Sequence, residues 1–324
     1  MANRYFSQYL LNKGVLTPEN AGEMLAKSLN VTPELSVLAL EKGLINSEQA
    51  LELAEAAGFI RAALGKNYLT ALQLDDLKKA VPERSACLGQ VLLDEGVVGL
   101  SELAKLFEES AAPDCHPVET AVHDMLVSWN ADENDYGYIK DYVELFLGAL
   151  QRFMNTDALI IQGDNSDGVD TTYLTYQSMG GALQLTVGCR MNGDVMLAMA
   201  KRFSGEVLTD VDEMAIDCIE EFCNVLNGLY IVNMSGKSQD MDLDMPQTVE
   251  NGEPGGDSVF QLRVETEFGG FVLYLSMDGF VFEDSKPLRW CFRGRVVRCL
   301  CCPAKNIYFL LDMMTERWYY LYRC

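Results

Sequence analysis

The first 110 residues repeat one pattern of apolar and polar positions. In each copy an apolar helical stretch ends at a glycine or a polar turn, an apolar pair follows, and a polar residue begins the next helix. The regular spacing predicts short helical hairpins stacked into an all-α bundle over residues 1–110. Thr17, Asn46 and Ser101 stand where helix N-caps are expected. The four copies are LLNKGVLTPENAGEML (10–25), LALEKGLINSEQALEL (38–53), ALGKNYLTALQLDDL (63–77) and VLLDEGVVGLSELAKLF (91–107).

From residue 138 onward the pattern mixes two periods. Residues 138–154 have apolar side chains at 3.6-residue spacing, which predicts a helix, and a second amphipathic helix is predicted over 212–230. The alternation of apolar and polar residues is clearest in 260–265, as in a half-buried strand. The order of helices and strand pairs predicts an α+β domain over 138–284, with helices packed on a mainly antiparallel sheet. The predicted strands cover 172–176, 182–187, 195–200, 260–266 and 270–275.

Two further segments complete a multidomain chain. Residues 111–137 are rich in Pro and in acidic, turn-forming residues, so we expect a linker there. Residues 285–324 hold eight Lys or Arg against two acids, and five of the ten cysteines. This composition differs from the rest of the chain, and we expect a poorly ordered basic tail.

Charge and apolar content restrict the partners and the compartment. A net charge of −23 argues against nucleic acid and against anionic membranes, because both would repel an acidic surface. No stretch reaches the roughly 20 apolar residues of a membrane span, and the first ten residues lack a signal-peptide core. The scattered cysteines do not form a disulfide framework. We therefore expect a cytoplasmic protein.

Metal ligands are weakly indicated. Asp114, Cys115 and His116 are consecutive, and three adjacent side chains do not converge tetrahedrally without further ligands. The run Cys299-x-Cys301-Cys302 in the tail leaves a zinc or copper site open, but no His accompanies it. We expect no metal and no cofactor in this chain.

The predicted helix 212–230 carries a polar stripe. Asp217, Glu221, Asn224 and Gly228 follow an i, i+4, i+7, i+11 rhythm and so share one face. Such a stripe can be a merely solvated face, but a solvated helix normally interleaves opposite charges. No Lys or Arg occurs between Phe203 and Gly236. The unneutralised acidic face suits docking on a basic partner surface.

Two residues of this helix have unfavourable propensities. Asn and Gly in a helix interior cost roughly 0.5–1 kcal/mol each relative to Ala. Asn227 with Gly228 could form an ordinary helix C-cap, which would explain the glycine without a function. Otherwise the two unfavourable choices favour a functional face.

The spacing D-x3-E-x2-N, with Pro246 after a further twenty-one residues, resembles the signature of the CheC/CheX/FliY family of chemotaxis phosphatases. The resemblance implies an enzyme that removes phosphate from the aspartyl phosphate of a CheY-like response regulator. It implies that Asn224 positions the attacking water and that Glu221 pairs with a lysine in the regulator's active site. Asp217, Gly228 and Pro246 would be supporting positions, and Mg²⁺ would belong to the partner.

The chemistry suits these residue types. Phosphoryl transfer depends on positioning and charge stabilisation more than on covalent chemistry by the protein. An Asn amide offers a donor and an acceptor, so it orients water without titrating. Asp141 in the earlier helix is followed at +4 by Leu145, so the chain resembles the single-site CheX branch. A non-catalytic adaptor that binds a receiver domain is the alternative, and a homodimer through a sheet edge stays open.

The N-terminal half resembles the helical N-terminal domains of type II secretion and pilus ATPases, some of which bind cyclic di-GMP. Those binders use R-L-G-x2-L with a downstream Gln-Leu pair. Here Leu88 and Gly89 keep only the L-G, Cys87 precedes them, and no matching pair follows. We expect an adaptor or partner-docking module, with a cyclic di-GMP sensor as the alternative.

Overall fold

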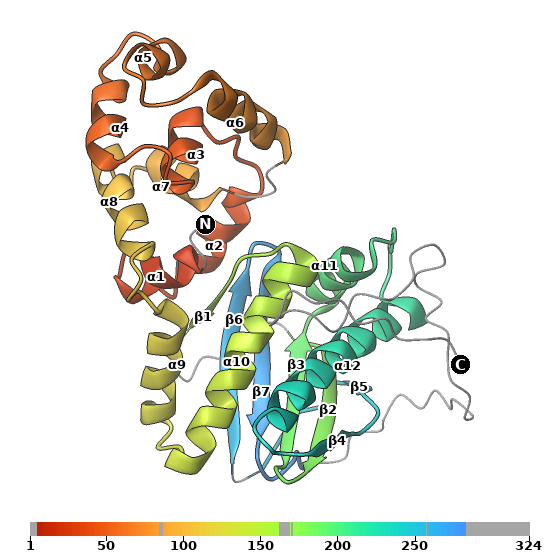
Figure 1. Cartoon of the computed structure of the whole chain (residues 1–324). Helices are drawn as coiled ribbons and strands as arrows, with labels where there is room; N and C mark the ends of the chain where they lie inside the picture. Colours follow the sequence, from red (N-terminus) through yellow and green to blue (C-terminus); the bar gives the residue numbers. More distant parts are fainter. Residues whose placement is uncertain (1–4, 84–86, 162–168, 170, 257, 283–324) are drawn as a thin grey trace. The chain divides into compact units, whose positions relative to one another are not determined.

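The structure is a computed structural model that describes residues 5–83, 87–161, 169, 171–256 and 258–282 (Figure 1). The chain divides into two compact units, which we call the helical unit and the sheet unit. The predicted tail over 285–324 lies outside the described residues. The helical unit comprises Met1–Asn130, Thr156–Gly163 and Val264–Gly270, and the sheet unit comprises Ala131–Asn155, Asp164–Arg263 and Phe271–Cys324.

The predicted repeat appears in the helical unit as a recurring helix end. In all four copies the first helix ends at a residue with a left-handed backbone: Gly14 (φ 73°), Gly43 (φ 63°), Asn67 (φ 56°) and Gly96 (φ 66°). In each copy the next backbone N–H reaches five residues back, over 3.0, 2.9, 3.0 and 2.9 Å. This hydrogen bond satisfies a carbonyl at the helix end. The helices are α1 (Phe6–Asn12), α2 (Ala21–Ser28), α3 (Leu35–Glu41), α4 (Ser47–Ala54), α5 (Phe59–Gly65), α6 (Ala71–Glu83), α7 (Leu88–Asp94) and α8 (Leu100–Ser110).

One of the three predicted N-caps is confirmed. Asn46 caps α4 with a full capping box, because its side chain accepts from the Gln49 backbone while the Gln49 side chain accepts from the Asn46 backbone. Helix α2 begins at Ala21 and α8 at Leu100, so the predictions of Thr17 and Ser101 as caps were wrong.

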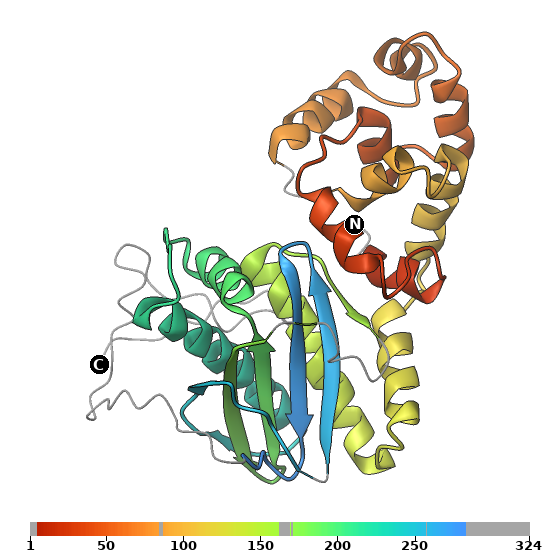
Figure 2. The ribbon, with the colours of Figure 1, turned by 180° about the vertical axis from the view of Figure 1, so that it is seen from behind.

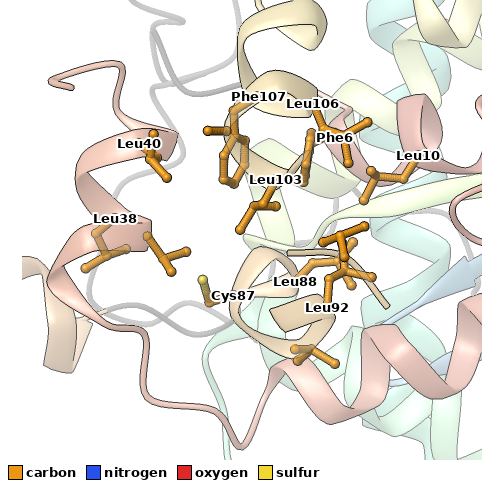
Figure 3. Close-up of a cluster of buried hydrophobic side chains, with 14 of the residues drawn as sticks. Phe6, Leu10, Leu38, Leu40, Cys87, Leu88, Leu92, Leu103, Leu106 and Phe107 are labelled. Atoms are coloured by element: carbon orange, nitrogen blue, oxygen red, sulfur yellow. The ribbon is translucent and has the colours of Figure 1, made fainter. Parts of the chain in front are cut away.

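One apolar core holds the helical unit together. Residues from all four copies belong to it. The rings of Phe6 and Phe107 stack in this core with centroids 4.4 Å apart (Figure 3). A Cβ on Gly89 would lie 2.8 Å from the Phe107 ring, so this position needs glycine for packing. The Leu-Gly pair therefore has a structural reason that does not involve a nucleotide.

The segment predicted as a linker is largely helical. Helix α9 (Pro117–Ser128) begins with Pro at its first position, and it buries Val118, Val122 and Met125. Helix α10 (Glu133–Met154) begins inside the same segment. The helix signal here is the 3–4 spacing of the apolar residues, which outweighs the local Pro and Asp residues.

The sheet unit confirms the predicted α+β class. Strand β2 pairs antiparallel with β3, β4 and β5, and β3 pairs antiparallel with β7. The order across the sheet is β6-β7-β3-β2-β4, with β5 also on β2. Helices α10, α11 and α12 cover one face of this sheet (Figures 1 and 2). The elements are α11 (Gly193–Ser204), α12 (Glu213–Ser235), β2 (Tyr173–Gly181), β3 (Leu185–Met191), β4 (Met241–Leu243), β5 (Gln247–Glu250), β6 (Val259–Thr266) and β7 (Gly269–Ser276). The helical unit also contains the short strand β1 (Ala158–Ile161).

One predicted strand was wrong. Residues 195–200 lie in α11, where Val195, Met196 and Met199 are buried at helical spacing. The helix begins because the Asn192 side chain accepts a hydrogen bond of 2.9 Å from the Val195 backbone N–H. Among the described residues, no helix has a long enough apolar stretch to cross a membrane.

Candidate functional site

Helix α12 carries the polar stripe and lies against the sheet. Asp212 caps its first turn by accepting from the Ala215 backbone N–H over 3.0 Å. The helix runs to Ser235, five residues beyond the predicted end. Asn227 and Gly228 are therefore inside the helix, and their interpretation as a C-cap was wrong. The helix buries Ala215, Cys218, Ile219, Phe222, Cys223, Leu226, Asn227, Tyr230 and Met234.

The predicted site residues lie together on the accessible side of α12. Asp217, Glu221, Asn224 and Gly228 are all half-buried, neither in the core nor fully in solvent. Pro246 is also half-buried and lies in the short connection between β4 and β5. Helix α12 packs on both of these strands.

Gln177 on β2 joins the stripe to the connection that contains Pro246. Its Nε2 donates to Asn224 Oδ1 over 3.2 Å and to the backbone carbonyl oxygen of Asp244 over 2.6 Å. The two bonds use both hydrogens of the Gln177 amide. The connection and the stripe therefore meet at one buried side chain.

The polar chain continues behind the stripe. Asn227 Nδ2 donates to Gln177 Oε1 over 2.8 Å, and the Tyr142 hydroxyl on α10 donates to Asn227 Oδ1 over 2.7 Å. Asn227 and Gln177 are 0% and 1% exposed, so water does not supply their hydrogen bonds. Gln177, Asn227 and Tyr142 were not among the predicted site residues. The available signal was Asn227 itself, an amide within the apolar arc of a helix, which needs a buried partner.

Glu221 and Asn224 are hydrogen-bonded to each other across one turn of α12, and the amide donates to the carboxylate. Burial raises the pKa of Glu221, and the bond from Asn224 lowers it in part. Burial also raises the pKa of Asp217, with a smaller contribution from the charge of Glu213. The stripe thus holds carboxylates that are partly desolvated and lack a neutralising cation on their own helix.

Glu220 is a second carboxylate at the edge of this surface. Burial raises its pKa most, while hydrogen bonds from the Thr248 side chain and backbone lower it. The Thr248 and Thr175 hydroxyls are 2.9 Å apart. Glu220 therefore anchors β5 on α12, which is a structural use of a carboxylate next to the stripe.

Gly228 leaves open space on the stripe. A Cβ built at this position would meet no atom within 4 Å. A glycine in a helix interior costs about 1 kcal/mol relative to Ala. Packing within the described part of the chain does not require a glycine at this position. A glycine here would allow another molecule to approach the helix closely.

The sheet unit contains two buried thiols that lie close together. Cys189 and Cys223 are buried against each other, and their hydrogen bond and burial raise the pKa of Cys189. Of the cysteines with described positions, none forms a disulfide. Within the described ranges, no three His, Cys, Asp or Glu side chains are grouped as metal ligands.

Comparison with known proteins gives one family match. The family described as chemotaxis phosphatase CheX matches residues 174–256. This range contains Gln177, the stripe on α12 and Pro246. No curated protein matches the chain as a relative.

Several solved structures are similar to part of the chain at low identity. A chemotaxis protein CheX from Desulfovibrio desulfuricans is 14% identical over 45% of this chain and 99% of its own, with a TM-score of 0.38. CheX from Vibrio vulnificus is 12% identical over 43% of this chain and 98% of its own, with a TM-score of 0.39. A CheX–CheY–BeF3–Mg complex from Borrelia burgdorferi is 15% identical over 43% and 96%, with a TM-score of 0.37. The family match thus agrees with the resemblance inferred from the motif, because residues 174–256 are similar to the chemotaxis phosphatase CheX family.

Proposed function

We propose that this protein hydrolyses the aspartyl phosphate of a CheY-like response regulator. The observation that carries the proposal is the pair Glu221–Asn224, which lies half-exposed on α12 with the amide held by a buried partner. Hydrolysis of an aspartyl phosphate needs a water in line with phosphorus. A rigid amide on an accessible face can hold a water in this position. No cofactor or metal is assigned to this chain, and Mg²⁺ belongs to the receiver.

Asn224 has the hydrogen-bonding capacity for this role. Its Oδ1 accepts from Gln177 over 3.2 Å and keeps a second lone pair for a water hydrogen. A water that donates to this oxygen keeps its own lone pair for attack on phosphorus. Because the amide does not titrate, it orients water over a wide pH range.

Glu221 supplies the contact to the regulator. Its carboxylate is bonded to Asn224 in the free protein, and burial raises its pKa, so a cationic partner group would stabilise its charged form. When Glu221 turns to a lysine of the receiver, the amide hydrogen of Asn224 that it accepted becomes available for the reacting water or the phosphoryl group. Docking and activation would then be coupled through one hydrogen bond.

The rest of the stripe fits the approach of a partner. Gly228 leaves room for another backbone or a phosphate-bearing loop. Asp217 adds negative charge one turn before Glu221, and Pro246 fixes the connection next to Asn224. An acidic face steers a basic surface toward it, and this attraction falls with ionic strength.

The test is the lifetime of a phosphorylated receiver domain with and without the full-length protein. We expect its decay to accelerate in proportion to the protein concentration and to saturate at high receiver concentration. The assay uses the set of receiver domains from the same cell. A protein that binds a phosphorylated receiver and leaves its lifetime unchanged would be a non-catalytic adaptor instead.

A further inference from the structure

We propose that Gln177 is a positioning residue that sets the orientation of the Asn224 amide, and that the backbone carbonyl of Asp244 dictates this orientation. The inference rests on the proposed function. It concerns how the site is held ready, and it assigns a role to a residue of β2 outside the helix motif.

The Asp244 backbone carbonyl can only accept, so the Gln177 atom at 2.6 Å from it must be the Nε2 donor. The other hydrogen of that nitrogen faces Asn224 at 3.2 Å, so the facing atom must be the acceptor Oδ1. The amide nitrogen of Asn224 is thereby directed away from Gln177.

The hydrogen bonds from Gln177 to Asn227 and Tyr142 are assigned in the same way. With Gln177 Nε2 committed, its Oε1 faces Asn227 at 2.8 Å, and the facing atom must be the donor Nδ2. Asn227 Oδ1 then accepts from the Tyr142 hydroxyl at 2.7 Å. Each of the three side-chain amides in this series of hydrogen bonds, Asn224, Gln177 and Asn227, therefore has one allowed orientation, although the oxygen and nitrogen of an amide have similar shapes.

An independent contact agrees with this orientation. The Asn224 nitrogen, which is turned away from Gln177, donates to Glu221. A charged carboxylate can only accept a hydrogen bond, so the facing atom of Asn224 must be the donor. A reversed Asn224 would place two donors together at Gln177 and two acceptors together at Glu221. Because Gln177 is 1% exposed, water could not relieve the clash.

The order of residues in this series of hydrogen bonds predicts that substitutions farther from Asn224 affect the turnover rate less. Gln177 touches Asn224 directly, whereas Tyr142 acts through Asn227 and Gln177 and lies at the far end. Loss of Gln177 donors should therefore change the turnover rate, while loss of the Tyr142 hydroxyl should mainly change stability.

The experiment uses full-length Gln177→Glu, which keeps the shape but replaces both donors by an acceptor. The carboxylate faces the Asp244 carbonyl and Asn224 Oδ1, so Asn224 should turn its nitrogen toward it. We expect the maximal rate of receiver dephosphorylation to fall about 10-fold or more, as for a displaced reacting group, with little change in the half-saturating receiver concentration. Gln177→Met is the second variant, in case the buried charge prevents folding.

Ser178→Ala is the matched control. Ser178 is the next residue on β2, and its hydroxyl lies 2.9 Å from that of Thr186. Its side chain points to the opposite side of the strand. Ser178→Ala should leave the rate unchanged, and Tyr142→Phe should lower the melting temperature more than the rate.

Two readouts separate positioning from general damage. In an Asn224→Ala background the Gln177 substitutions should cause no further loss of rate, because the group they orient is gone. The side-chain amide NMR signals of Asn224, identified by their absence in Asn224→Ala, should shift in the Gln177 variants and stay in place in Ser178→Ala.

The outcomes are distinguishable from failure of the proposed function. If the wild-type protein does not shorten any receiver lifetime, the proposed function fails, and the NMR signals still decide the orientation of Asn224. If wild type is active and Asn224→Ala is not, but folded Gln177→Glu and Gln177→Met keep the wild-type rate and Asn224 signals, the positioning role is overturned.

Discussion

The Tyr142 hydroxyl on α10 donates a hydrogen bond of 2.7 Å to Asn227 Oδ1 on α12. The ring of Tyr142 also meets the ring of Tyr230 edge to face, with centroids 5.2 Å apart. Both tyrosines are fully buried, and burial raises the pKa of each hydroxyl. The bond therefore fixes the two helices at one register, since a shift would leave a buried amide unpaired.

Asn224→Ala is expected to abolish accelerated dephosphorylation while the fold is retained. Loss of a group that positions the attacking water costs on the order of 100-fold in rate. Ala is the better helix former by about 0.5 kcal/mol, so stability should hardly fall. Asn233→Ala on the same helix is the control, and it should keep full activity. Full activity of folded Asn224→Ala would remove Asn224 from the site.

Glu221→Gln should weaken binding of the phosphorylated receiver more than it slows the bound reaction. The substitution keeps the shape and removes the charge that faces the partner. The remaining affinity should depend less on salt than that of wild type, because a charge pair is lost. Titrations at two ionic strengths measure this, with Glu206→Gln on the exposed connection before α12 as the control. An unchanged salt dependence would argue against a charged contact at Glu221.

Gly228→Ala should stabilise the free protein and impair its function. The methyl group meets no atom of the described structure, and Ala in place of Gly favours a helix interior by about 1 kcal/mol. The melting temperature should therefore rise, while the affinity for the receiver falls. A variant that is both more stable and fully active would show that the partner does not approach this position.

The helix ends of the repeat predict opposite results for two exposed glycines. Gly43 has φ 63°, and an L-residue in this conformation is strained by about 1–2 kcal/mol. Gly65 is in α5 with ordinary helical geometry, and Ala should stabilise it by about 0.5–1 kcal/mol. Neither added methyl would meet an atom within 4 Å. Chemical denaturation of Gly43→Ala and Gly65→Ala measures both, and equal shifts would contradict the repeated left-handed helix end.

Asp157 should make the stability of the helical unit depend on pH. Burial raises its pKa from 3.8 to about 6, helped by the charge of Glu267. The folded state therefore binds a proton more tightly than the unfolded state, and stability is lost as pH rises from about 4 through 6. Asp157→Asn mimics the protonated group, so it should unfold at a higher temperature than wild type at pH 7 and at a similar temperature at pH 4. The same difference at both values would exclude this titration.

The sequence alone determined the repeat and the stripe. Four copies of one apolar pattern specify four helix ends, because Gly or Asn is needed wherever the backbone becomes left-handed. The spacing of Asp217, Glu221 and Asn224 fixes a shared face, because helix geometry alone sets which residues are neighbours. The α+β class followed from the alternation of two periods.

The tertiary structure decided what local patterns leave open. Residues 195–200 suit a strand or a helix, and the Asn192 cap and the packing of Met196 and Met199 select the helix. The roles of Gln177 and Tyr142 depend on contacts across 47 and 85 positions of sequence. No local period encodes such contacts, because a buried amide finds its partner only when sheet and helices are assembled.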